Sequence, residues 1–413
     1  MSLNMDTGKK NILSGETIVI LALSRFDSDI QSTSYTIAKE LAKNNRVFYV
    51  DNPFTINEYF RLKNTAAYKR RKSFFSPFSC GLLNSGTPSF KIIITPVILS
   101  LHFLPEGKIY RQLLKVNQWI IRKRIRKVLA KEKVNRFIYV NSANFHFPDL
   151  SKSSKPVLKV YHCVDPIFTG FDAKHGLVSE PELIRNSDLI VCTSKQLQEE
   201  KKLLNAATYF IPNAADLGNI NLEEIQVHAV LKDIKRPIIG YFGVIERRID
   251  YDLLKEVITK NTDKSFVFAG PVVASDVPGW FYNQSNLHLT GAFPYEEMPA
   301  LIKGFDVAII PFKKDDVSRT IFPLKLFEYI GIGKPVVSTD FNPDLKEFTK
   351  DTVAFCDDAA GFSAAIQQEL TSNSQQKIKK RMAVAAENTW VKRAQDFSEL
   401  LASQIKITLN ALV

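Results

Sequence analysis

Residues 17–51, with the sequence TIVILALSRFDSDIQSTSYTIAKELAKNNRVFYVD, decide the fold class. The stretch opens with an apolar run of strand length, 17–23, and closes with a second predicted strand, 46–51, whose centre is apolar. Between them, residues 34–44 have the spacing of an amphipathic helix. A strand, a helix and a strand in this order form a βαβ unit with parallel strands. The stretch therefore predicts a doubly wound α/β sheet.

The same alternation continues along the chain and is interrupted once, by a polar stretch at 217–237. Because 413 residues exceed a usual single core, we predict two Rossmann-like domains, 1–225 and 226–390, facing each other across a cleft. A helical tail, 391–413, is expected to cross back onto the first domain. Further strands are predicted at 91–95, 136–140, 157–162, 189–192, 209–211, 238–242, 266–269, 287–290, 307–310 and 336–339, and further helices at 251–259, 295–302 and 325–331.

The composition is that of a folded globular protein, with 45% apolar and 24% charged residues. No apolar run reaches the roughly 20 residues that a membrane-spanning helix needs, and residues 1–10 lack the apolar core of a signal peptide. We therefore expect a cytoplasmic protein. The four cysteines show no metal-ligand spacing and are predicted to be buried apolar side chains.

The net charge of +12 is concentrated in the N-terminal half, where basic runs at 61–72 and 108–133 predict a positive surface. Apolar residues recur at helical spacing over 113–129, so this segment is a cationic amphipathic helix. Two interpretations stay open: the helix packs on the core with a solvated basic back, or it lies on an anionic membrane surface. No nucleic-acid-binding motif accompanies the charge, and we expect no nucleic-acid partner.

The segment 320–339, TIFPLKLFEYIGIGKPVVST, carries the chemistry of the C-terminal half. Pro323 and Leu324 stand at the expected start of a helix, whose first N–H groups are free to bind a diphosphate. Lys325 adds a positive charge there. One turn further, Glu328 can accept two hydroxyl hydrogen bonds from a ribose. The same residues also fit an ordinary helix with a charged face.

This segment resembles the donor-binding signature of GT-B fold glycosyltransferases of the family 4, or group 1, type. These bacterial enzymes build surface polysaccharides, including the teichuronic acid type, and share a Pro-x-Lys-x-x-Glu-Tyr helix followed by Gly-Lys-Pro-Val-Val. The resemblance implies a nucleotide-sugar substrate and sugar transfer with retention. It implies no metal and no cofactor. A lipid-linked or polysaccharide intermediate of cell-surface glycan synthesis is the expected acceptor, bound at the inner membrane face.

Two further matches concern the donor. Residues 238–250 resemble the first strand and turn of the donor domain, where Gly243 lets the backbone approach the phosphates and Arg248 neutralises them. Arg247 is the second candidate for that charge. Residues 289–293 resemble the turn that receives the nucleotide base beside Phe293, although plain core packing also explains this side chain.

In the first domain, residues 160–165, VYHCVD, resemble the strand end that the family places at the cleft. Asp165 and His162 are the predicted catalytic residues, since a carboxylate or a near-neutral imidazole can accept a proton as the new bond forms. The loop 24–31 is expected to line the acceptor side, with Arg25 and Asp27 as its contacts.

One departure from the family pattern concerns the donor sugar. Many family members have two glutamates eight positions apart, whereas Thr320 stands at the earlier position here. The sugar contacts are then expected from Ser318, Arg319, Thr320 or the backbone. Two alternatives to a transferase follow: a scaffold that binds nucleotide sugar without turnover, and a nucleotide-sugar 2-epimerase.

Overall fold

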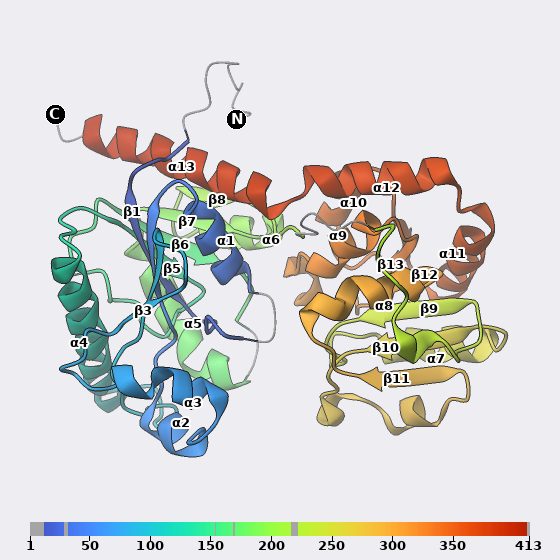
Figure 1. Cartoon of the computed structure of the whole chain (residues 1–413), viewed down its shortest axis with the longest axis horizontal. Coiled ribbons are helices and arrows are strands. Elements are labelled where there is room, and N and C mark those ends of the chain that lie inside the picture. Colours follow the sequence, from blue (N-terminus) through green and yellow to red (C-terminus); the bar gives the residue numbers. More distant parts are fainter. Residues whose placement is uncertain (1–11, 29–31, 153, 168–169, 216–221, 411–413) are drawn as a thin grey trace. The chain divides into compact units, whose positions relative to one another are not determined.

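The computed structural model describes residues 12–28, 32–152, 154–167, 170–215 and 222–410. The chain divides into two compact units (Figure 1). Unit 1 comprises Met1–Pro212 with Arg393–Val413, and unit 2 comprises Asn213–Lys392. Residues 29–31 of the predicted acceptor loop and 216–221 of the predicted linker lie outside the described residues.

Unit 1 is built on an eight-stranded sheet in the order β3-β4-β2-β1-β5-β6-β7-β8. All neighbouring strands are parallel except β3 and β4. The chain adds strands on one side of β1 and then returns to its other side at β5, so the strand order reverses between β1 and β5. The strands are β1 (Thr17–Ala22), β2 (Arg46–Val50), β3 (Leu82–Asn84), β4 (Phe90–Ile93), β5 (Ile138–Ser142), β6 (Leu158–Cys163), β7 (Leu189–Cys192) and β8 (Thr208–Phe210).

Helices cover this sheet, and α4 is the longest helix among the described residues. Its buried stripe, which includes Leu114, Ile121 and Ile125, joins the apolar core formed with β1, β2 and β5. Its other face carries exposed Trp119 and Lys123. The predicted amphipathic helix is therefore present and packs on the core. The helices of unit 1 are α1 (Thr33–Leu41), α2 (Ile56–Arg61), α3 (Ala66–Arg71), α4 (Lys108–Lys131), α5 (Gly170–Arg185) and α6 (Lys195–Lys202), together with α13 (Trp390–Asn410), most of which belongs to this unit.

The last helix, α13, packs on unit 1 although it lies at the far end of the sequence (Figure 1). The hydroxyl of Ser398 accepts a hydrogen bond from the backbone N–H of Leu13, with a donor–acceptor distance of 2.8 Å. Gln404 donates to the hydroxyl of Tyr209 at 3.0 Å, next to the end of β8. Long-range contacts to both ends of the unit 1 sequence therefore hold the helix in place.

Unit 2 is a six-stranded, wholly parallel sheet in the order β11-β10-β9-β12-β13-β14. Its central strands are buried, which explains their nearly continuous apolar sequences. The strand order reverses between β9 and β12. The elements are β9 (Ile238–Phe242), β10 (Ser265–Ala269), β11 (Leu287–Gly291), β12 (Val307–Ile310), β13 (Val336–Thr339), β14 (Ala354–Cys356), α7 (Tyr251–Lys260), α8 (Met298–Gly304), α9 (Leu324–Gly331), α10 (Asp344–Thr349), α11 (Ala359–Ser372) and α12 (Gln375–Glu387).

The predicted fold class, with a parallel α/β sheet in each half, is confirmed. The predictions missed the three-residue strands β3 and β14. Cys163, Cys192 and Cys356 are buried as predicted, whereas Cys80 is only partly covered. Within the part of the chain that the structure describes, no helix combines the length and the apolar character needed to span a bilayer.

Candidate active site

The carboxyl ends of β9 and β10 in unit 2 are shaped by two glycines with positive φ. Gly243 follows β9 and donates its N–H to the carbonyl of Ala269 at 2.8 Å. A Cβ added at Gly243 would lie 2.6 Å from Nζ of Lys325, and one added at Gly270 would lie 2.0 Å from the carbonyl oxygen of Gly243. These two positions need glycine, because any side chain would fill the space at the strand ends.

Lys325, in the first turn of α9, reaches the point where the strand order reverses. Its Nζ donates to the hydroxyl of Tyr241 at 2.6 Å and lies 4.1 Å from the centroid of that ring. The ring of Phe312, just after β12, is 5.0 Å away. Burial and, to a smaller extent, the nearby positive charge of Arg248 lower the pKa of Lys325 to about 7, although Glu328 and Glu246 oppose the shift. The ammonium is therefore poised to gain or lose its proton near neutral pH.

Glu328 lies one turn further along α9, with only 3% of its surface exposed. The hydroxyl of Tyr295 donates to its Oε1 at 2.6 Å. Burial raises the pKa of Glu328, and the Tyr295 hydrogen bond and Lys325 offset part of that increase. The hydroxyl of Tyr329 accepts from the N–H of Phe242 at 2.7 Å and so ties α9 to β9.

Arg248 lies beside the same aromatic ring as Lys325. Its guanidinium is 5.6 Å from the centroid of Phe312, and its Nε forms an ion pair with Glu246. The structure therefore brings Gly243, Arg248 and Lys325 together at one end of the sheet. Arg247 is exposed, and its backbone N–H donates to Asp276 at 3.2 Å.

The start of α9 combines Pro323 at the N-cap with Leu324 as the first helical residue. Pro323 makes no side-chain hydrogen bond to the helix, so side-chain capping does not occupy the first N–H groups. The preceding turn is anchored by Asn213, which donates to the carbonyl of Phe322 at 3.1 Å. The helix start is thus fixed at the end of the sheet as an anion-binding position.

The residues considered for sugar contact have different surroundings. Thr320 is buried and donates its hydroxyl to the carbonyl of Val317 at 2.7 Å, inside its own 3₁₀ turn. The hydroxyl of Ser318 is buried and makes no hydrogen bond to any described residue. Arg319 lies on the surface. Phe293 packs partly against the core, edge to face with His228 at a centroid distance of 4.9 Å.

The two predicted catalytic residues of unit 1 lie in different environments. His162 is 4% exposed, its Nδ1 lies 2.9 Å from the hydroxyl of Ser142, and its ring packs edge to face on Phe397. Burial lowers the pKa of His162 to about 4, so the imidazole is neutral at physiological pH. Asp165 is exposed, two residues beyond the end of β6. Their catalytic roles stay predictions.

Arg25 and Asp27, the predicted acceptor contacts, already take part in ion pairs of unit 1. Asp27 accepts hydrogen bonds from Arg71 at 2.5 and 2.8 Å and from Arg70 at 3.0 Å. Burial raises the pKa of Asp27, but these ion pairs outweigh it and the net shift is downward. Arg25 donates to Glu58 at 2.6 Å.

The assignment of the run 61–72 to a positive surface is wrong for Arg71, which is fully buried. Its Nε bonds to Asp51 at 2.7 Å, in addition to the contacts with Asp27. The sequence analysis did not predict the polar partners Asp51 and Glu58. Asp51 directly follows β2, and Glu58 lies in α2. A carboxylate directly after a buried strand was the available signal for Asp51.

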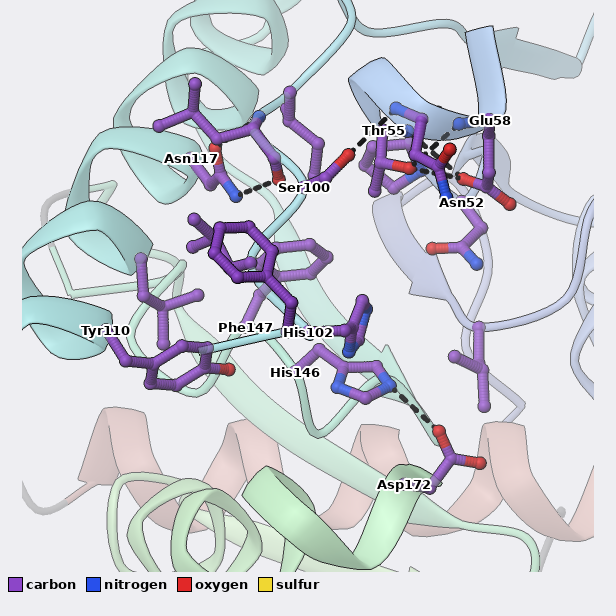
Figure 2. A pocket seen from close by; sticks show the side chains of 18 of the residues that line it. Asn52, Thr55, Glu58, Ser100, His102, Tyr110, Asn117, His146, Phe147 and Asp172 are labelled. Atoms are coloured by element: carbon purple, nitrogen blue, oxygen red, sulfur yellow. Dashed lines mark hydrogen bonds and ion pairs between the residues drawn. The ribbon is translucent and has the colours of Figure 1, made fainter. Parts of the chain in front are cut away.

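The sequence reasoning also missed a cavity of about 530 Å³ within unit 1 (Figure 2). It lies beyond the carboxyl ends of the parallel strands β1, β2, β4 and β5, and therefore includes the point where the strand order reverses. Single polar residues after those strands were the signal that could have found it. Its lining includes Leu23, Asn52, Thr55, Glu58, Arg61, Ser100, His102, Tyr110, Asn117, His146, Phe147 and Asp172.

Among the described residues, no group of three or more His, Cys, Asp or Glu side chains is arranged to hold a metal ion. The polar groups at the donor-side position of unit 2 are a lysine, an arginine and helix N–H groups, which are ligands for anions.

Comparison with known proteins identifies the domain type of unit 2. Residues 236–372 match the family model described as glycosyl transferases group 1. The chain is 26% identical over 266 residues to a Bacillus subtilis (strain 168) protein, provisionally named teichuronic acid biosynthesis glycosyltransferase TuaH. That match covers 59% of this chain and 66% of the relative, which is slightly less than two thirds of its length.

Solved structures are similar over nearly the whole chain. Sucrose-phosphate synthase from Thermosynechococcus elongatus has a TM-score of 0.63 at 15% identity and covers 96% of this chain and 100% of its own. Anabaena HepE in complex with UDP has a TM-score of 0.61 at 13% identity, with coverages of 94% and 100%. At these identities the likeness shows the fold, which is GT-B. The resemblance found in the signature is confirmed: unit 2 carries a glycosyltransferase domain of group 1.

Proposed function

We propose that the protein is a glycosyltransferase that binds a nucleotide-sugar donor on unit 2 and transfers the sugar to a hydroxyl group of an acceptor. The observation that carries this proposal is the meeting of Arg248 and Lys325 over Phe312 where the unit 2 sheet reverses its strand order, with Glu328 one turn further along α9. Ligands of open α/β sheets bind at such points. The family match over residues 236–372 supports the same conclusion.

In this proposal each donor group has partners of matching chemistry. Lys325, Arg248 and the first N–H groups of α9 hold the diphosphate and stabilise the negative charge that develops as it leaves. Glu328 accepts hydrogen bonds from the ribose, and Phe293 contacts the base. Lys325 and Arg248 both lie over Phe312, so this ring fixes where the positive charge is concentrated.

The acceptor we propose is a lipid-linked or polysaccharide intermediate of cell-surface glycan synthesis, with retention of the anomeric configuration, as the resemblance implies. The name of the Bacillus subtilis relative supports this class of acceptor. Asp165 is the proposed contact to the reacting hydroxyl because it is exposed after β6.

We also propose that α4 contacts an anionic membrane surface. Its outward face carries Trp119, 55% exposed, together with exposed Ile109 and Val116. The Nζ of Lys123 lies 5.0 Å from the centroid of the Trp119 ring, so aromatic and cationic groups are adjacent, as at membrane interfaces.

The activity is tested with a thermal-shift screen of UDP- and GDP-sugars, followed by donor hydrolysis and transfer assays. A ligand that binds only the folded state raises the melting temperature. We expect Lys325→Ala and Glu328→Ala to abolish both turnover and the shift, while the exposed control Lys346→Ala leaves them intact. Binding without turnover in the wild type would favour the scaffold, and donor isomerisation without an acceptor would favour the epimerase.

The membrane contact is tested by sedimentation with vesicles that contain anionic lipid. Arg122 donates to the carbonyls of Asp149 and Leu150, so its replacement would disturb the fold. The informative variant is therefore Lys123→Glu with Arg126→Glu, both exposed. We expect reduced sedimentation, whereas Lys255→Glu with Lys379→Glu, an equal charge change on unit 2, has no effect. Equal sedimentation of both variants would refute the contact.

A further inference from the structure

The ammonium group of Lys325 is held by a side chain that lies outside the signature helix. Its Nζ donates a hydrogen bond of 2.6 Å to the hydroxyl of Tyr241, on the inner strand β9. The same helix and strand meet again one helical turn further, where the hydroxyl of Tyr329 accepts from the N–H of Phe242 at 2.7 Å. Two tyrosines, one from each element, therefore join α9 to β9 where the strand order of unit 2 reverses.

The hydroxyl of Tyr241 has a fixed position. The side chain is fully buried, and its ring packs against Phe268 and Phe312 at centroid distances of 5.5 and 6.5 Å. A Cβ added at Gly243 would lie 3.5 Å from this hydroxyl and 2.6 Å from the Nζ of Lys325, so the backbone closes another side. The fold therefore sets the place of the hydroxyl before any ligand binds, which reduces the cost of ordering the site.

The hydrogen bonds of Tyr241 also have a fixed direction. Its hydroxyl donates to the carbonyl of Val244 at 2.9 Å, so its oxygen accepts from Lys325. Burial raises the pKa of Tyr241, and the phenol therefore stays neutral at physiological pH. A neutral acceptor orients an ammonium without cancelling its positive charge, whereas a carboxylate in the same place would neutralise it.

The other groups around Nζ act on its charge in opposite directions. Burial and, to a smaller extent, the charge of Arg248 lower the pKa of Lys325. The carboxylates of Glu328 and Glu246 oppose that shift. Three further titratable groups lie close to these residues: Tyr251, Tyr295 and Tyr329. A hydrogen bond to the charged form favours that form, so the hydroxyl of Tyr241 also opposes the effect of burial.

We propose that Tyr241 is a positioning residue, whose hydroxyl holds the Nζ of Lys325 at the end of the sheet in its protonated form. An ammonium has three N–H donors, and Tyr241 is its one hydrogen-bond partner among the residues that the structure describes. Two donors are thus left for an anion. The identification of this anion as the diphosphate of a nucleotide sugar rests on the proposed function.

The first test measures the ionisation of Lys325 directly. The variant Tyr241→Phe removes the hydroxyl and keeps the ring. Heteronuclear NMR follows the side-chain signal of Lys325, assigned by its loss in Lys325→Arg, as the pH changes. We expect a titration midpoint of about 7 in the wild type and one lower by about one pH unit in the variant, because only the ammonium must donate to the hydroxyl.

The matched control is Tyr251→Phe. This variant also loses a hydroxyl that donates to a backbone carbonyl, that of Glu246, at 3.2 Å. The lost bond does not involve Nζ, so the midpoint of Lys325 should stay as it is in the wild type.

The second test measures the affinity for UDP by calorimetry at two pH values. We expect Tyr241→Phe to bind UDP about threefold more weakly than the wild type at pH 7. At pH 5.5 the two affinities should agree within about twofold, because Lys325 is then mostly protonated in both proteins. A hydroxyl with only a structural role would weaken binding by the same factor at both pH values.

Two results would overturn the proposal: an unchanged midpoint of Lys325 in Tyr241→Phe, or a loss of UDP affinity of the same size at pH 5.5 and pH 7. Failure of the donor function gives a different result. If UDP does not bind the wild type while the midpoint still falls in Tyr241→Phe, the proposed donor site is contradicted and the positioning of Lys325 by Tyr241 stands.

Discussion

The carboxyl ends of the two sheets differ in how they arrange the residues that the sequence predicted there. In unit 2, the two predicted cations, Lys325 and Arg248, meet around Phe312 and Gly243 in surroundings that suit an anionic ligand. In unit 1, the predicted residues separate: His162 is in the core and Asp27 is in an ion pair with a buried arginine. A contiguous motif on one helix keeps its residues together, whereas single polar residues in loops are free to pair with distant partners.

The largest expected effect tests whether the charges of the predicted acceptor loop are structural. Arg71→Ala would leave Asp51 buried without its cation and Asp27 with Arg70 alone, so we expect unit 1 to lose about 3–5 kcal/mol of stability. The neighbouring Arg70 is 55% exposed, and Arg70→Ala should cost at most about 1 kcal/mol. Urea unfolding of both variants measures the difference. Equal losses of stability in the two variants would contradict the structural role of the buried Arg71 ion pairs.

The second effect acts on unit 2. In Gly270→Ala, the new Cβ would lie 2.0 Å from the carbonyl oxygen of Gly243, and backbone cannot move away cheaply. We expect a loss of about 2–3 kcal/mol and weaker nucleotide binding, because the two strand ends shape the site. Gly279→Ala is the control, since no atom lies within 4 Å of its added Cβ. Thermal unfolding with and without nucleotide checks both, and similar behaviour of the two variants would argue against the strand-end packing.

The third effect is the pH dependence of donor binding. The charged form of Lys325 binds the diphosphate, and its pKa is about 7 in the free protein. Donor affinity should therefore fall by about tenfold as the pH rises from 6 to 9. In Lys325→Arg the cation persists, so the decrease should disappear. Calorimetric titration across this range measures it; an identical slope in the variant would exclude Lys325 as the titrating group.

The stability of the free protein should change in the opposite direction over the same range. Because the pKa of Lys325 is lower in the folded state than its ordinary value of 10.5, the unfolded chain binds more protons between pH 7 and 10.5. This group therefore makes the protein more stable as the pH rises through that window. The difference between the wild type and Lys325→Met isolates the contribution, and a difference that is independent of pH would refute it.

The smallest effect concerns His162. A general base contributes about a hundredfold or more to a rate, whereas we expect a neutral imidazole that lies in the core and bonds to Ser142 to act mainly on stability. We expect His162→Asn to change the transfer rate by less than about tenfold and to cost about 1 kcal/mol of stability. A loss of a hundredfold or more with unchanged stability would restore the catalytic assignment.

The sequence was informative wherever the signal is local. The strands of both sheets follow from apolar runs, and the region around Lys325 and Glu328 follows from a motif whose spacing is fixed by one helix. Arg71 could not be placed, because its burial depends on Asp27 and Asp51, which are far away in sequence. The cavity in unit 1 was hidden for the same reason: its lining comes from separate segments that only the sheet brings together.

The position of α13 also has a consequence for synthesis of the chain. Unit 2 is one contiguous segment, whereas unit 1 needs residues from both ends of the sequence. The contacts of Ser398 with Leu13 and of Phe397 with His162 form only after the last helix has left the ribosome. During translation unit 1 therefore lacks α13 while unit 2 can already fold, although all eight strands of the unit 1 sheet have been made by then.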